Sequence, residues 1–214
     1  MKTLYRPVGL AEMKLILDAD LKAFPPRLPE QPIFYPVLNK TYADKIASDW
    51  NTKDRFSGFV GFVTEFDVQS PFIDRFEAQI VGSTVHEELW IPSEDLEEMN
   101  DNIAGRIKLI DAFYGKPYTG LTPESTVFDG QSPAEQFKTW CAIYNHNPMD
   151  FYGEIREHWI YIYMNYAYWT ELDHAAAGVS EAEKKEVMLK MNEYWTEQFA
   201  DIPLLSKSGK GASL

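Results

Sequence analysis

The chain has 214 residues, of which 45% are hydrophobic and 14% aromatic, a composition that supports a packed core and argues against disorder. Its net charge of −13 is shared between residues 1–121, at −6, and residues 122–214, at −7, so neither part has the basic face that long nucleic acids require. No stretch reaches the roughly 18 apolar residues of a membrane span, and a single cysteine, with no apolar leader after Met1, predicts a protein of the reducing cytoplasm.

Residues 1–121 are expected to form one domain of short strands and short helices. Apolar positions alternate in some segments and recur every three or four residues in others. In chain order, the expected strands are 4–8, 33–35, 59–68, 78–81, 88–91 and 103–113. Helices or helical turns are expected at 10–18, 40–50, 71–76 and 94–100, with Asn39 and Ser93 as caps of the second and the last. A turn is expected at 82–84, and the prolines of 24–29 predict a stiff loop that displays Arg27.

Residues 122–214 are expected to form a helical region, entered through a connector rich in Pro and Gly at 115–130. Helices are predicted at 133–145, 150–172 and 181–199, and capping boxes begin at Ser132 and Ser180. Cys141 lies in an apolar helical context, which favours a place in the core over a reactive thiol. Packing is also favoured over an aromatic ligand box for the stripe formed by Tyr161, Tyr163, Tyr166, Tyr168 and Trp169.

The run from His86 to Pro92 contains the most informative side chains of the chain. Glu88 stands at the head of a short apolar strand, and His86, two residues earlier, is expected on the same face. A carboxylate held in this way can stabilise a developing cation or orient a sugar hydroxyl. The alternative is an edge strand whose acids are only solvated.

Arginine side chains supply the second group of candidates. Arg6 follows two apolar residues in the first strand and Arg27 is flanked by prolines, and a guanidinium fork suits a pyrophosphate or a carboxylate. Surface solubility is the alternative for both. The four histidines share no metal-binding spacing, so no metal site is predicted, although Glu154 and His158 are four apart on one helix face.

Taken in chain order, these pieces resemble the ADP-ribosyltransferase fold. Such domains place Arg or His on the first strand, an aromatic residue or a Ser-Thr-Ser element on a middle strand, and a catalytic Glu at the head of a late strand. Arg6, Tyr35 and Glu88 match these three positions. More narrowly, residues 1–115 resemble a family of short bacterial and phage proteins sometimes labelled "ADP-ribosylation/crystallin J1". The segments that carry this likeness are Leu4–Leu10, Ala23–Pro29, Gln31–Asn39 and Asp49–Thr52.

The resemblance implies an α+β fold, with a small split sheet, mixed or antiparallel, and short helices, followed by the helical C-terminal region. It also implies a transferase that cleaves NAD bound between two small sheets. Arg6 would hold the phosphates or the adenosine ribose with help from Arg27, and Tyr35 would stack on nicotinamide. Glu88 would bind the nicotinamide-ribose 2′-hydroxyl and stabilise the oxocarbenium-like state.

Two departures from the family pattern bear on the acceptor of ADP-ribose. No Ser-Thr-Ser element is present, and Ser57 is the nearest substitute. His86 replaces the first acid of the Glu-x-Glu pair and would act as general base, since its ordinary pKa of about 6.5 suits neutral pH. The acceptor, which includes water in an NAD glycohydrolase, is not defined by the sequence.

A different class of function is a binding module without catalysis. The acidic, aromatic-rich residues 122–214 would then engage a basic protein or a second copy of the chain.

Overall fold

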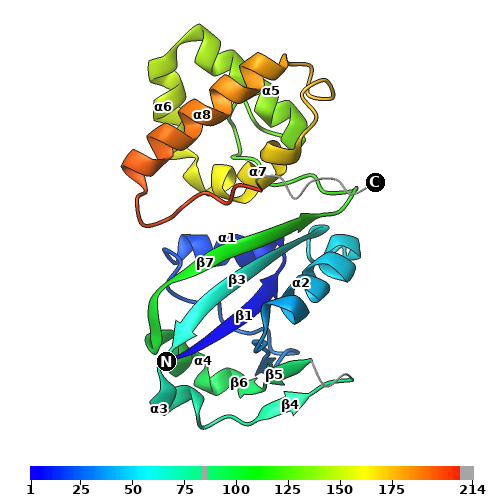
Figure 1. The fold of residues 1–214 in the computed structure, drawn as a ribbon, viewed down its shortest axis with the longest axis vertical. Helices are drawn as coiled ribbons and strands as arrows, with labels where there is room; N and C mark the ends of the chain where they lie inside the picture. The colour runs from blue at the N-terminus through cyan, green and yellow to red at the C-terminus, as the bar shows by residue number, and fades with distance from the viewer. Residues whose placement is uncertain (83–85, 208–214) are drawn as a thin grey trace. The chain divides into compact units, whose positions relative to one another are not determined.

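The computed structural model describes residues 1–82 and 86–207. The chain divides into two compact units, Met1–Tyr118 and Thr119–Leu214 (Figure 1). Each unit has its own buried side chains. Across the described residues, no helix combines the length and the apolar character needed to cross a lipid bilayer. The turn predicted at 82–84 lies largely outside the described residues, although Gly82 itself has a φ of +77°.

The predicted α+β class is confirmed, because the first unit combines short antiparallel strands with short helices and the second is helical. The strands of the first unit are β1 (Lys2–Val8), β2 (Ile33–Phe34), β3 (Val60–Val68), β4 (Ala78–Ile80), β5 (Glu87–Leu89), β6 (Ile91–Pro92) and β7 (Ile103–Tyr114). Its helices are α1 (Leu10–Asp18), α2 (Lys40–Asp49), η1 (Asn51–Lys53), α3 (Ser70–Ile73), η2 (Ser93–Asp95) and α4 (Leu96–Asp101).

The main sheet has the order β1-β3-β7, and all of its pairs are antiparallel. Shorter ladders join β2 to β6 and β4 to β5. Val37 connects β1 of the main sheet to β5, since it forms isolated bridges with Tyr5 on one side and with Glu88 on the other. The Val37 amide donates to the Tyr5 carbonyl at 2.8 Å, and the Leu89 amide donates to the Pro36 carbonyl at 2.9 Å. Residues 36–38 therefore lie between β1 and β5.

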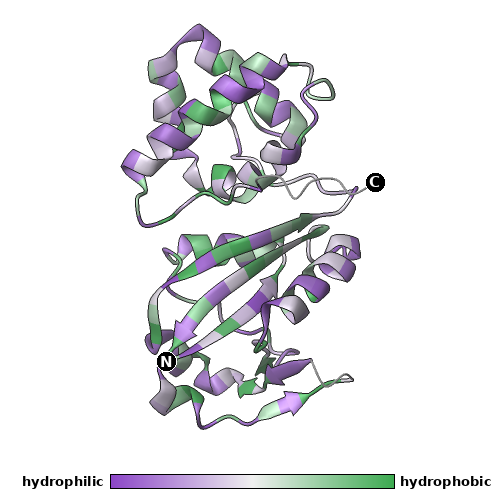
Figure 2. Cartoon of the chain, viewed as in Figure 1, coloured by the Kyte–Doolittle hydropathy of each residue, from purple (hydrophilic) through white to green (hydrophobic). Residues whose placement is uncertain are grey.

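The sheet has two faces with different partners. Cross-strand neighbours in an antiparallel ladder project from the same face, so Tyr5, Val37 and Glu88 share one. Val37 packs there against Tyr42 of α2, and this side is called the α2 face. Arg6 follows Tyr5 along β1 and projects from the other side, called the α1 face. Figure 2 shows hydrophilic and hydrophobic positions alternating along β7.

The α1 face carries an aromatic core. Phe24 lies with its ring centroid 4.9 Å from that of Phe34 and 4.8 Å from that of Phe66, and all three are almost fully buried. Burying a side chain of this size stabilises the fold by about 1.5–3 kcal/mol. The Pro-rich loop is fixed by this contact and by Asn100, whose side chain bonds both the amide and the carbonyl of Phe24.

In the first unit, most element boundaries agree with the sequence-based expectations, but two details do not. Asn39 caps α2 as expected, because its side chain accepts from the Tyr42 amide at 2.8 Å. The Ser93 cap is wrong: its side chain makes no capping bond, and the α-helix starts at Leu96 after a 3-10 turn. The strand expected at 88–91 is divided into β5 and β6, with the interruption at Trp90.

The second unit contains α5 (Pro133–His146), α6 (Pro148–Glu157), α7 (Trp159–Glu171) and α8 (Glu181–Gln198). Ser132 forms the expected capping box. The Ser180 hydroxyl accepts from the Glu183 amide, which is one of the two hydrogen bonds of a capping box. The single helix expected at 150–172 is wrong, because the chain leaves helical geometry at His158, with φ −108° and ψ 27°. That side chain is nevertheless paired with Glu154, at 3.1 Å.

The core of the second unit is aromatic. Cys141 is buried, as expected, and burial raises the pKa of its thiol to about 12. Of the predicted aromatic stripe, Tyr163, Tyr166 and Trp169 are buried. Trp169 donates its indole hydrogen to the Pro133 carbonyl, which ties α7 to the start of α5.

Candidate functional site

Glu88 lies at the centre of the candidate site, on β5. Its backbone pairs with Gln79 of β4 and with Val37, so the position is fixed from both sides. The Trp90 indole nitrogen donates to the Glu88 Oε1 at 2.8 Å. Leu89, which lies between them, is fully buried, whereas Trp90 is 49% exposed. The strand thus presents carboxylate and indole together on its accessible side.

His86 and Glu88 both border Tyr42. The imidazole of His86 stacks on the Tyr42 ring, with centroids 4.2 Å apart and planes 7° apart. Burial raises the pKa of Tyr42, and the charge of Glu88 adds to this increase. The phenol therefore stays protonated at neutral pH, and the stack holds the imidazole on the same side of the sheet as the carboxylate.

Tyr35 extends this group of side chains along the neighbouring strand. Its ring is 40% exposed and meets the Trp90 ring edge-on, with centroids 6.1 Å apart. The structure thus brings Glu88, Trp90 and Tyr35 into one contiguous group. Exposed aromatic rings beside a carboxylate offer a stacking surface and a hydrogen-bond acceptor to the same ligand.

Arg6 lies on the α1 face and not with Glu88. It makes two bonds to Glu12 of α1, from Nε at 2.8 Å and from Nη2 at 3.1 Å, and a third to the Tyr35 carbonyl at 3.2 Å. Its guanidinium also covers the Phe34 ring, 4.5 Å from the centroid. The donors that the sequence suggests for a phosphate are therefore engaged within the protein.

Arg27 has a different environment. One of its terminal nitrogens donates to Gln31 at 2.8 Å, but its Nε is buried and has no partner among the described residues. Burial lowers the pKa of Arg27, and the neighbouring charge of Arg6 lowers it further; Glu12 and Tyr35 act in the opposite direction. A partly desolvated guanidinium with an unused donor favours an anion.

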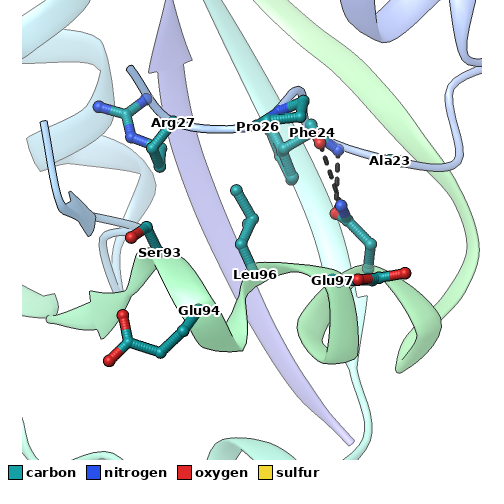
Figure 3. Close-up of a pocket in the computed structure, with 9 residues that line it drawn as sticks. Ala23, Phe24, Pro26, Arg27, Ser93, Glu94, Leu96 and Glu97 are labelled. Atoms are coloured by element: carbon teal, nitrogen blue, oxygen red, sulfur yellow. Dashed lines mark hydrogen bonds between the residues drawn. The ribbon is translucent and has the colours of Figure 1, made fainter. Parts of the chain in front are cut away.

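An open hollow of about 740 Å³ lies between the Pro-rich loop and the segment 93–100. In Figure 3, Arg27 stands at one end above Ser93, Leu96 occupies the middle, and Glu97 lies towards the other end. The volume is in the range of small-molecule sites. The residues that line it are Ala23, Phe24, Pro26, Arg27, Ser93, Glu94, Leu96, Glu97 and Asn100.

Ser57 lies apart from these groups. Its hydroxyl donates to Asp54 at 2.7 Å and its carbonyl accepts from the Leu10 amide at 2.9 Å. Within the described part of the chain, it has no hydrogen bond to the other predicted site residues. The same part of the chain contains no cluster of three or more His, Cys, Asp or Glu that could hold a metal ion.

Sequence reasoning did not select Trp90 or Tyr42 as members of the site. Trp90 could have been found, because it lies two residues after Glu88 and strand periodicity places both on one side. Tyr42 has no such signal, since it reaches His86 only through the packing of α2 against the sheet.

Comparisons of the chain with protein-family models, with curated proteins and with solved structures each gave no match. Arguments about function therefore depend on the geometry of Glu88 and its neighbours.

Proposed function

We propose that this protein cleaves NAD at the bond between nicotinamide and ribose and transfers ADP-ribose to an acceptor or to water. The observation that carries the proposal is the placement of Glu88 between an indole donor and a neighbouring strand that bears the exposed Tyr35 ring. The proposal is also supported by the order of the segments, because Val37, two residues after Tyr35, bridges to Tyr5 of β1 and to Glu88 of β5.

Glu88 supplies the electrostatic part of the reaction. The bond from the ribose C1′ to the nicotinamide nitrogen breaks, and nicotinamide leaves with the bonding electron pair. The positive charge that develops on the ribose is stabilised by the carboxylate. Its Oε1 is held by Trp90, and its Oε2 accepts no hydrogen bond within the described residues, so this oxygen is available to the ribose 2′-hydroxyl. Preorganised charge of this kind contributes several kcal/mol to catalysis.

Tyr35 and Trp90 supply the binding surface. Nicotinamide is flat and cationic in NAD, which suits an exposed aromatic ring. Arg6 is bound by Glu12, whereas Arg27 has no carboxylate partner within the described residues, so the pyrophosphate is assigned to Arg27.

His86 completes the reaction. The acceptor oxygen or nitrogen attacks C1′, and its proton passes to the imidazole and then to solvent. The ring is oriented by its stack on Tyr42. An imidazole is a suitable base at neutral pH.

The test measures nicotinamide released from NAD by the wild-type chain, by Glu88→Gln and by Glu87→Gln. Glu88→Gln should lower the rate about 100-fold or more, because the charge that opposes the developing cation is lost. Glu87 is the matched control, since it is the adjacent acid on the same strand and projects from the opposite side. Glu87→Gln should retain the wild-type rate.

Two results would reject the proposal. The first is an equal rate in the wild type and Glu88→Gln, which would remove the carboxylate from the chemistry. The second is a wild-type chain that releases no nicotinamide and shows no change in melting temperature with NAD at millimolar concentration. A ligand present at 100 times its Kd stabilises by about 2.7 kcal/mol, so binding would be visible.

A further inference from the structure

The second unit has an open groove between α7 and α8, with a volume of about 470 Å³ that is in the range of small-molecule sites. Two hydrogen bonds define how the helices run along it. The Lys184 ammonium of α8 donates to the Thr170 carbonyl of α7 at 3.1 Å. The Tyr166 hydroxyl of α7 donates to the Met188 carbonyl of α8 at 3.4 Å. The two helices are therefore antiparallel, and all residues that line the groove belong to the second unit.

One end of the groove has an ammonium group without a carboxylate partner. The Nζ of Lys184 donates to two carbonyls at the end of α7, which takes up two of its three hydrogens. Among the residues that the structure describes, no carboxylate lies within ion-pair distance of this Nζ, whereas the neighbouring Lys185 is paired with Glu181 at 2.6 Å. Burial lowers the pKa of Lys184, and the charge of Asp173 acts in the opposite direction. The third hydrogen of Lys184 thus remains for a bound anion.

The middle of the groove is apolar. One turn further along α8 lie Met188 and Leu189, opposite Tyr166 of α7. Leu189 is 54% exposed, and burial raises the pKa of Tyr166 to about 12, so its phenol is neutral at neutral pH. Lys184 and Leu189 are five positions apart on one helix, a separation of roughly 7.5 Å along the axis. The groove therefore presents a positive charge and, next to it, an apolar wall.

These two features restrict what the groove can bind. A cation would be repelled by Lys184. A bare inorganic anion would leave the apolar wall in water, and an uncharged apolar molecule would leave the ammonium further desolvated. An anion that carries an apolar body satisfies both parts, because its charged group accepts from Lys184 while the body covers Leu189. A single negative charge fits best, since one ammonium balances one charge in a chain of net charge −13.

From this geometry we infer that the groove between α7 and α8 binds a small organic acid, with its carboxylate on Lys184 and its aliphatic body against Tyr166 and Leu189. The inference gives the helical unit a ligand of its own. It does not depend on the cleavage of NAD, because no residue of the first unit lines the groove.

The experiment measures binding of octanoate, octanol and acetate to the full-length chain by titration calorimetry at neutral pH. Octanol has the same apolar body as octanoate without the charge, and acetate has the charge without the body. The wild type should bind octanoate about tenfold or more tightly than either of the other two. The carboxylate contributes a charge-assisted hydrogen bond, and the alkyl chain contributes buried apolar area.

Two substitutions separate these contributions. Lys184→Gln should weaken octanoate about tenfold and leave octanol unchanged, because an amide can still donate to the carbonyls of α7 but has no charge. Leu189→Ser should weaken both ligands about threefold or more, because part of the apolar wall is removed. Lys190→Gln is the matched control and should bind like the wild type. It removes the next lysine along α8, which pairs with Glu193 at 2.8 Å and does not line the groove.

Equal melting temperatures establish that the variants are folded. The inference is overturned if the wild type binds no octanoate at millimolar concentration, or if octanol binds as tightly as octanoate. It is also overturned if Lys184→Gln keeps the wild-type preference, or if this variant loses both ligands equally, which would make Lys184 a support of the groove and not a ligand-binding group. None of the three ligands takes part in the proposed cleavage of NAD, so that proposal stands or falls on its own test.

Discussion

Two guanidinium groups, those of Arg6 and Arg27, lie close enough for the charge of Arg6 to lower the pKa of Arg27. Among residues 1–82 and 86–207, only Arg6 of the two has a carboxylate partner. The sequence presents both as candidates for an anion, and nothing in their neighbours along the chain distinguishes them. The distinction comes from Glu12, which α1 brings to Arg6 because Gly9 begins the turn into the helix. At this scale, packing decides which of two equivalent side chains is available.

We expect Arg6→Met to destabilise the fold by about 3 kcal/mol, because it leaves the partly buried Glu12 carboxylate without its partner. Urea unfolding followed by circular dichroism measures this. The double variant Arg6→Met and Glu12→Gln should recover part of the loss. A stable Arg6→Met that no longer binds NAD would instead place Arg6 among the ligand-binding residues.

The loop at 54–57 gives a pH dependence with a definite sign. The Ser57 hydroxyl, followed by the amides of Phe56 and Ser57, holds the pKa of Asp54 below its ordinary value. A carboxyl whose folded pKa is lowered stabilises the fold above its unfolded pKa of about 3.9, and the contribution is lost as pH falls through the folded value.

Wild-type stability should therefore decrease more steeply below about pH 4 than that of Asp54→Asn. Urea midpoints at several pH values between neutrality and strong acid make the comparison. Parallel pH profiles would show that the ionised carboxylate does not support the loop.

At the scale of elements, capping residues divide into those that sequence spacing identifies and those that it does not. Asn39 and Ser132 were predicted from residue type and spacing, and both make the bond. Ser93 is also a hydroxyl residue directly before a predicted helix. The chain enters a 3-10 turn there, however, and the hydroxyl makes no capping bond. The difference arises because the Ser93 amide bonds the Pro32 carbonyl at the end of the β2–β6 ladder, a contact between distant segments.

Replacing the two candidate caps with alanine should give unequal results. Asn39→Ala should cost about 1 kcal/mol, because the Tyr42 amide loses its acceptor at the start of α2. Ser93→Ala should change the free energy of unfolding by less than about 0.5 kcal/mol, as substitutions away from such features do. Both residues belong to the first unit, so one urea transition reports both; an equal cost would contradict the assigned geometry.

The packing and pairing of elements also explain why the sequence predicts only part of the candidate site. Strand periodicity relates His86, Glu88 and Trp90, which are neighbours along one segment. It also predicts that Arg6 is a strand residue, but not which face it occupies, since that depends on the pairing of Tyr5 with Val37. The long helix expected at 150–172 failed for a related reason: the apolar pattern continues through His158, and only the backbone reveals the break.

For the molecule as a whole, the α+β class followed from the change of apolar period along the chain, and each unit has its own buried core. In the first unit, β3 and α2 approach each other closely at Gly61, where a Cβ would lie 2.5 Å from the Ala47 Cα of α2. The second unit contains the only cysteine of the chain, buried and with a raised pKa. These two features allow the units to be perturbed and observed separately.

We expect Gly61→Ala to destabilise the first unit by about 1–3 kcal/mol, because α2 must move away from β3. The reaction of Cys141 with a thiol-specific disulfide reagent should remain as slow as in the wild type, since its own core is unchanged. Circular dichroism and the absorbance of the released thiolate follow the two events. Faster labelling in Gly61→Ala would show that both units open in one cooperative step.

The position of residues 36–38 between β1 and β5 limits which sequence changes this fold can accept. Single-residue replacements there alter one contact, whereas an insertion or deletion of one residue would shift the pairing and exchange the two sides of the strand. Val37 would then leave its place beside Tyr42 on the α2 face. Relatives that share this architecture are therefore expected to vary in the residues of this segment but not in its length.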